Sequence, residues 1–312
     1  SAGVAQRGIL RYLESQPPEQ ALALLDQLPL GGTAVFDDAR RRLKLHMLTQ
    51  RADTAIDQQQ WQEASVLLLN AQYLDPDDPW LSYRLASVLR EQGRPDEGLN
   101  TFQTHLNRHP GAPASRYAHG LLLAAVEHWQ DALDTLAVIP ADQWDIRMHE
   151  LDTRARDSRL LAHASTLRDA DRPDDAIAAL RQRPESVRVR LQLAQWLSEG
   201  GDYAEALDHY EAVMRMDPGN GEARLGQLET WLAQGSPDPV RAALVSADFQ
   251  FDTASTSAHR RVAALWAGLG ETARAKAILR QRASTLLEPE PLLYRDLARL
   301  ERHDNPGQAL DY

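Results

Sequence analysis

The sequence of 312 residues contains no cysteine and only two lysines, Lys44 and Lys276. The lack of cysteine excludes disulfide bonds and zinc sites built from thiolates, and it fits an oxidising compartment as well as a reducing one. No stretch approaches the ~20 apolar residues of a membrane helix. A glycine-rich phosphate loop and the Gly-x-Ser-x-Gly turn of many hydrolases are also missing. The sequence therefore offers no recognisable catalytic motif.

Acidic residues outnumber basic ones, and the net charge is −11. Binding to phosphate backbones needs clustered cations, so we expect no nucleic acid among the partners. The hydrophobic content of 43% fits a folded protein. The chain begins Ser-Ala-Gly without a methionine, so we expect it to be a processed or excised segment.

A small residue recurs at a spacing of 34 residues or at about twice that spacing. The series consists of Ala64, Gly98, Ala132, Ala206, Ala275 and Ala309. A small residue at a fixed phase lets two helices cross closely once in each unit. This pattern resembles the tetratricopeptide family, whose 34-residue helix pairs stack into a solenoid. The predicted fold class is therefore an all-α, right-handed superhelical solenoid, which favours binding over catalysis.

Two longer steps interrupt this spacing, 43 residues from Ala21 to Ala64 and 44 residues from Ala132 to Ala176. We expect an extra-helix insertion at each step, acting as a joint between rigid blocks. The predicted regions are the start of a repeat block at 1–34, a long or extra helix at 35–60, regular repeats at 61–141, a second long or extra helix at 142–171, regular repeats at 172–289 and a truncated final repeat at 290–312. Because a solenoid does not end in mid-repeat, we expect the natural protein to continue beyond Tyr312.

Groups that resemble metal or catalytic sites have simpler structural interpretations. His105 and His109 are four residues apart, which is metal-ligand spacing, but no third ligand is near them in the sequence. The carboxylate pairs Asp77-Asp78 and Asp174-Asp175 fall at helix starts, where acids satisfy free N–H groups. We therefore predict no catalytic residue, no metal site and no cofactor.

The binding candidates are residues of the first helix in each repeat. They occupy the positions of that helix that face the concave side of such arrays. The aromatic candidates are Trp80, Tyr83, Tyr117 and Tyr294, and the polar ones on or beside the same groove are Arg84, Arg188, Gln195 and Arg260. Aromatic rings at these positions stack on a sugar ring or anchor a peptide. Packing against the neighbouring repeat is the competing interpretation.

A narrower resemblance appears in the C-terminal half, in residues 194–197, 201–207, 260–263 and 293–301. These stretches resemble the bacterial cellulose synthase operon protein C family. The resemblance implies a periplasmic repeat region in front of the protein's own outer-membrane β-barrel. Implied partners are the cellulose synthase subunits, with the glucan chain or peptidoglycan as further ligands. The family supplies no catalytic motif.

The leading hypothesis is a non-catalytic periplasmic scaffold for cellulose synthesis and export, which links the inner-membrane synthase to the outer-membrane barrel. One alternative is the equivalent scaffold of an alginate or poly-N-acetylglucosamine export system. Another is a generic tetratricopeptide adaptor for peptide ligands. Adaptors for acidic peptide ends use lysine and asparagine in the groove, where this sequence has Tyr83, Ser87, Tyr117 and Leu121. A polysaccharide-processing enzyme is the third reading, and it lacks a site.

Overall fold

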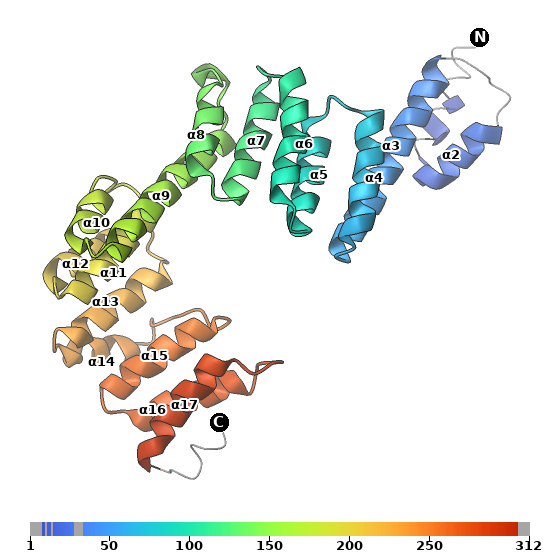
Figure 1. The fold of residues 1–312 in the computed structure, drawn as a ribbon. Helices are drawn as coiled ribbons and strands as arrows, with labels where there is room; N and C mark the ends of the chain where they lie inside the picture. The colour runs from blue at the N-terminus through green and yellow to red at the C-terminus, as the bar shows by residue number, and fades with distance from the viewer. Residues whose placement is uncertain (1–7, 10, 14, 28–33, 305–312) are drawn as a thin grey trace. The chain divides into compact units, whose positions relative to one another are not determined.

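The computed structural model describes residues 8–9, 11–13, 15–27 and 34–304, and all regular secondary structure in these ranges is helical (Figure 1). This confirms the all-α prediction. The chain divides into two compact units, the first ending at Arg159 and the second beginning at Leu160. None of the helices in the described ranges combines the length and the apolar character that crossing a bilayer requires.

The first unit contains the helices from the N-terminal side up to the first part of α9. They are α2 (Pro18–Gln27), α3 (Ala34–Asp57), α4 (Trp61–Leu74), α5 (Pro79–Glu91), α6 (Pro95–Arg108), α7 (Pro113–Ala125), α8 (Trp129–Ala137), the short 3₁₀ helix η1 (Ala141–Gln143) and the first part of α9 (Ile146–Asp169). Consecutive helices pair as α3 with α4, α5 with α6 and α7 with α8. The first helix α5 also packs on α7, the first helix of the next pair.

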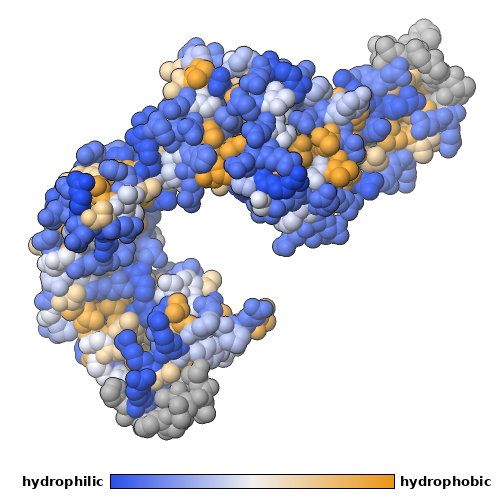
Figure 2. Space-filling model, in the orientation of Figure 1, coloured by the Kyte–Doolittle hydropathy of each residue, from blue (hydrophilic) through white to orange (hydrophobic). Residues whose placement is uncertain are grey.

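The second unit repeats this arrangement. It holds the rest of α9 and then α10 (Pro173–Leu180), α11 (Val187–Gly200), α12 (Tyr203–Met216), α13 (Gly221–Ala233), α14 (Pro237–Val245), α15 (Thr256–Gly268), α16 (Thr272–Ala283) and α17 (Pro291–Asp304). First helices pack side by side along the unit, α11 on α13, α13 on α15 and α15 on α17. Over the face shown in Figure 2, hydrophilic residues predominate and hydrophobic residues form separate patches.

The small residue of each repeat lies where its two helices cross. Ala64, Ala132, Ala206 and Ala275 are fully buried. At Gly98 the helices are closer still, because a Cβ atom there would lie 2.6 Å from the backbone oxygen of Ala86 in α5. The prediction of a close crossing is confirmed at these positions, while Ala309 lies outside the described residues.

The turn between the two helices of a pair has one repeated backbone conformation. One residue in each of seven such turns has a positive φ, namely Gln59, Gly93, Glu127, Asp171, Gly201, Gly235 and Gly270. The next N–H donates to the carbonyl five residues earlier, at 2.7 to 3.0 Å in all seven turns. This is the Schellman ending of a helix, and it satisfies carbonyls that the first helix leaves open.

Side-chain caps fix where several first helices begin. The side chains of Asp78, Ser186, Asn220 and Ser255 each accept a hydrogen bond from a backbone N–H in the first turn of α5, α11, α13 and α15. Proline occupies the start of α5 directly after its cap, where no amide hydrogen is needed. The expected structural role of Asp78 as a helix-start acid is therefore confirmed.

The two long steps of the sequence correspond to long helices. α3 and α9 have 24 residues each, compared with 13 in α5 and α7. The left-handed turns after them place each as the first helix of an ordinary pair, so the extra-helix insertions are not confirmed. In α9, Leu151 packs in a core of the first unit and Ala164 in a core of the second. Whether these regions act as joints stays a prediction.

A buried ion-pair cluster attaches the last described helix. Glu301 of α17 is 2% exposed and accepts a hydrogen bond from the Lys276 ammonium of α16 at 3.0 Å. The Arg280 guanidinium bonds its other carboxylate oxygen. One of the two lysines thus serves the packing of α17, because a buried carboxylate needs charged partners.

Replacing Gly98 with alanine tests the close crossing. The added methyl meets the Ala86 backbone, which cannot move aside, so overpacking of ~1–3 kcal/mol outweighs the gain in helix propensity of up to ~1 kcal/mol. We expect a lower urea midpoint by circular dichroism. Gly111→Ala is the control, because nothing lies within 4 Å of its Cβ position. Equal midpoints for the two variants would contradict the crossing geometry.

A matched exchange tests the left-handed turns. Glu127 has φ 62° and Gly93 has φ 76° at the same place in adjacent repeats. Because side chains disfavour this region by roughly 1–2 kcal/mol, Glu127→Gly should raise the melting temperature and Gly93→Ala should lower it. Thermal unfolding followed by circular dichroism measures both. Shifts of the same sign in the two variants would refute the assignment.

Candidate interaction surface

Three aromatic candidates meet on α5 and α7. The Trp80 ring lies 5.8 Å from Tyr83 and 6.1 Å from Tyr117, edge-to-face in both contacts. The Asp78 carboxylate fixes the turn that presents Trp80, since it accepts the Trp80 N–H at 2.8 Å. Trp80 is 36% exposed, Tyr83 is half-buried and Tyr117 is buried. Trp80 and Tyr83 are therefore the rings of this cluster that reach the surface.

Tyr117 has contacts that suit packing. The Arg147 guanidinium lies 5.7 Å from its ring centroid, which is a cation–π distance. Burial raises the pKa of Tyr117, so the phenol stays protonated. Arg84, next to Tyr83 in sequence, pairs with the Asp53 carboxylate of α3 and so links two first helices. Whether any of these residues binds a ligand remains a proposal.

A pocket of about 660 Å³ opens beside α11 and α13. Arg188 and Gln195 of α11, two of the sequence candidates, line it. The Gln195 amide donates to Glu199 at 2.9 Å, one turn further along the same helix. Tyr210 forms part of its wall, and burial raises the pKa of this phenol to about 12.

Arg261 joins this pocket to the next one. Its guanidinium donates two hydrogen bonds of 2.7 Å to the Glu229 carboxylate and also pairs with Glu222. Burial opposes its charged form, but the hydrogen bonds and attraction of Glu229 and Glu222 outweigh that effect and raise the pKa of Arg261. The arginine therefore stays charged and ties α15 to α13.

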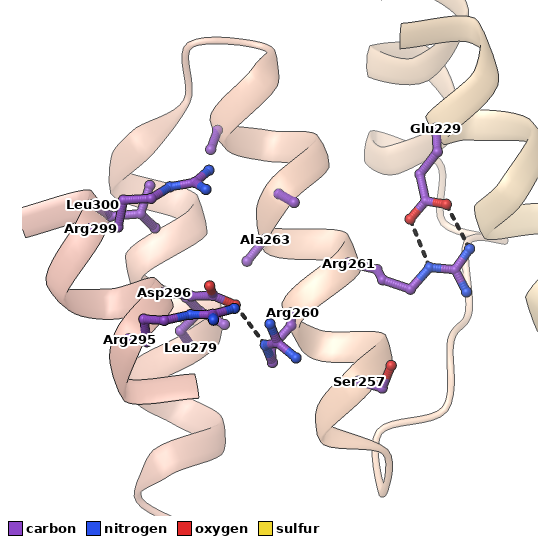
Figure 3. A pocket seen from close by; sticks show the side chains of 12 residues that line it. Glu229, Ser257, Arg260, Arg261, Ala263, Leu279, Arg295, Asp296, Arg299 and Leu300 are labelled. Atoms are coloured by element: carbon purple, nitrogen blue, oxygen red, sulfur yellow. Dashed lines mark hydrogen bonds and ion pairs between the residues drawn. The ribbon is translucent and has the colours of Figure 1, made fainter. Parts of the chain in front are cut away.

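The third candidate region lies between α15 and α17, in a pocket of about 320 Å³ (Figure 3). Arg260 lines it and donates to the Asp296 carboxylate at 2.6 Å. Tyr294, predicted for the same groove, does not line this pocket and instead packs half-buried against the hydrophobic core of the unit. In this pocket Arg260 therefore meets Asp296 of α17, whereas the predicted Tyr294 is not part of the lining.

The histidine pair considered as metal ligands is engaged otherwise. His105 is fully buried, with Nε2 3.0 Å from Ser115 Oγ and Nδ1 3.3 Å from the Pro76 carbonyl. Burial lowers the pKa of His105 and favours its neutral form. His109 pairs with Asp77 at 3.0 Å. Within the described part of the chain, no three histidine or acidic side chains group as metal ligands would.

Comparison with known proteins places this repeat geometry in a family. A tetratricopeptide-repeat model matches residues 55–125 and 197–264, and a second model with the same description matches 161–220. Together the matches cover more than half of the chain. The chain belongs to the tetratricopeptide-repeat family. The small-residue crossings and left-handed turns are the physical form of its repeats in this chain.

Named relatives of this tetratricopeptide-repeat chain carry one recurring name. The chain is 32% identical over 302 residues to putative cellulose synthase operon protein C of Escherichia coli O157:H7. It is 31% identical over 302 residues to cellulose synthase operon protein C of Escherichia coli strain K12. Each match covers 95% of the chain and 26% of the relative. The protein of that name in Salmonella typhimurium is 34% identical over 214 residues, 69% of the chain and 18% of the relative. The chain thus spans about a quarter or less of their length.

The sequence interpretation missed several residues of the tetratricopeptide-repeat groove. Arg261, Glu229, Arg295 and Arg299 line the pockets, but none was a candidate. Arg295 and Arg299 do carry a signal, because cations four residues apart share a helix face. The signal is weak in a chain rich in arginine, and only the packing of α15 beside α17 gives it a place.

A pH series tests the environment of His119, which stacks on Phe102 at 5.7 Å and lies 3.2 Å from Thr135 Oγ1. Burial, assisted by Arg116, lowers the pKa of His119 from 6.5 to about 4. The unfolded chain therefore takes up a proton that the folded chain refuses, so stability falls from pH 6.5 towards pH 4.

We expect wild-type protein to lose about 1 kcal/mol more than His119→Gln between pH 7 and pH 5, after discounting for partial exposure. Urea unfolding at the two pH values measures this difference. Identical losses in the two proteins would show that His119 titrates normally when folded.

Proposed function

We propose that this chain is a non-catalytic periplasmic scaffold for bacterial cellulose synthesis and export. In this proposal it holds subunits of the cellulose synthase complex at a set distance from the protein's own outer-membrane barrel. The glucan chain and peptidoglycan are further proposed ligands, and the full-length protein is anchored in the outer membrane. The proposal concerns the whole protein, of which the chain represents about a quarter of the length of its relatives.

The observation that carries the proposal is the 31% identity to cellulose synthase operon protein C of Escherichia coli over 95% of the chain. Local repeat similarity does not explain an alignment of this extent, because the aligned residues include the long helices α3 and α9 as well as the regular pairs. The recurring name supports cellulose over alginate or poly-N-acetylglucosamine as the exported polymer.

Physical support for a scaffold comes from ion pairs between first helices. Arg84 of α5 bonds Asp53 of α3, Arg261 of α15 bonds Glu229 of α13, and Arg260 of α15 bonds Asp296 of α17. Each pair joins positions about one repeat apart, and its arginine is half-buried. Such contacts fix the spacing of adjacent repeats within a unit, which suits a protein that positions partners.

An in-frame deletion of residues 35–304 from the full-length gene in a cellulose-producing bacterium tests this function. We expect secreted cellulose, measured as glucose after cellulase digestion, to fall at least about tenfold. Isolated membranes should still make glucan from UDP-glucose, because the synthase itself is untouched. Immunoblotting of outer-membrane fractions controls for the level of the shortened protein. Normal secretion with the shortened protein present would contradict the scaffold.

A further inference from the structure

The pocket between α15 and α17 has an apolar floor. Ala263, Ala267, Leu279 and Leu300 line it together with the exposed Ala264. Two of these residues, Ala264 and Ala267, have only a methyl side chain. Ala264 and Ala267 lie six and three residues before the left-handed Gly270.

The same register in neighbouring repeats carries longer side chains. Six residues before Gly201 is Gln195, and six before Gly235 is Glu229. Three residues before the same glycines are Ser198 and Leu232. Methyl groups on α15 thus stand where α11 and α13 carry longer side chains, and they make the floor of this pocket apolar, whereas the polar Gln195 and Ser198 line the pocket beside α11 and α13. The apolar floor is a local departure from those two repeats.

The rim of this pocket carries an excess of positive charge. Four arginines line it, Arg260, Arg261, Arg295 and Arg299, against the two carboxylates Glu229 and Asp296. Both carboxylates are engaged, Glu229 by Arg261 and Asp296 by Arg260. Among the ion pairs of the described residues, none includes Arg295 or Arg299, and both side chains are exposed. Figure 3 shows their guanidinium groups directed towards the space between α17 and α15.

We propose that this pocket binds a segment of a partner protein in which an apolar side chain is flanked by carboxylates. The apolar side chain rests on the alanine and leucine floor. A carboxylate lies between Arg295 and Arg299, which share one face of α17, and it accepts hydrogen bonds from their planar guanidinium groups. The chain as a whole has a charge of −11, so this local excess of cations marks a specific acidic partner.

Two other occupants fit the observations less well. A neutral glucan gains little from two guanidinium groups that form no ion pair among the described residues. A second copy of this chain repels the first over most of its acidic surface. The partner inference rests on the proposed scaffold function for its biological setting only, because the binding itself is measurable on the purified chain.

The test uses the purified chain and three fluorescent dodecapeptides. One consists of four Glu-Leu-Glu blocks, and its twins carry glutamine or lysine in place of glutamate. Fluorescence anisotropy should show the acidic peptide binding about tenfold more tightly than the glutamine twin at about 50 mM salt, with the difference shrinking at about 500 mM. Equal affinity of wild-type protein for the acidic and glutamine peptides overturns the proposal.

Charge reversal locates the site. Arg295→Glu with Arg299→Glu should abolish the preference for the acidic peptide and favour the lysine twin. Arg154→Glu with Arg215→Glu changes the net charge equally at exposed positions outside the pocket and should leave binding as in wild-type protein. If the reversed variant melts early, Arg295→Gln with Arg299→Gln replaces it. Unchanged acidic-peptide affinity in the folded pocket variant overturns the proposal.

Two further arms separate the alternatives. Displacement of the acidic peptide by cellohexaose would assign the pocket to glucan, and dimerisation of wild-type protein that the pocket variant loses would assign it to a second copy. Either result overturns the proposal. In cells, the deletion of residues 35–304 tests the scaffold separately. Normal secretion after that deletion, with the peptide preference intact, would refute the function and leave the pocket inference standing.

Discussion

The close crossing of two helices at one small residue is the constraint on which the rest of this structure depends. Ala64, Ala132, Ala206 and Ala275 are fully buried, and Gly98 contacts the backbone of the partner helix. With the helices this near, the larger apolar side chains on either side of the crossing reach both their partner and the next pair. Each repeat therefore builds its core locally, and the chain needs no central core.

The backbone turn supports this crossing. A left-handed residue and a Schellman hydrogen bond end the first helix in each of the seven described turns, whatever the length of that helix. α3 reaches 24 residues without losing its pairing with α4, and α9, also of 24 residues, ends in the same left-handed turn before α10. A lengthened repeat is thus accommodated within the first helix, where added residues continue the hydrogen-bonding pattern, and the crossing itself is unchanged.

The same regularity shapes the groove. First helices of successive pairs pack side by side, so positions about one repeat apart become neighbours and form ion pairs such as Arg261 with Glu229. The pocket beside α17 differs from the pocket beside α11 and α13 in its floor, where Ala264 and Ala267 stand in place of the polar Gln195 and Ser198.

The sequence by itself determined the helical class, the 34-residue pairing and the close crossings, because these follow from local spacing along one chain. It also offered Trp80, Arg188 and Arg260 as binding candidates, since phase on a helix is a local property. In the structure Trp80 is partly exposed, and Arg188 and Arg260 line pockets. Only the tertiary structure decided that the long steps are lengthened helices, that Tyr117 is buried and that Arg295 and Arg299 face Arg260. Exposure and charge balance depend on which side chains of neighbouring repeats meet, and spacing within one repeat does not contain that information.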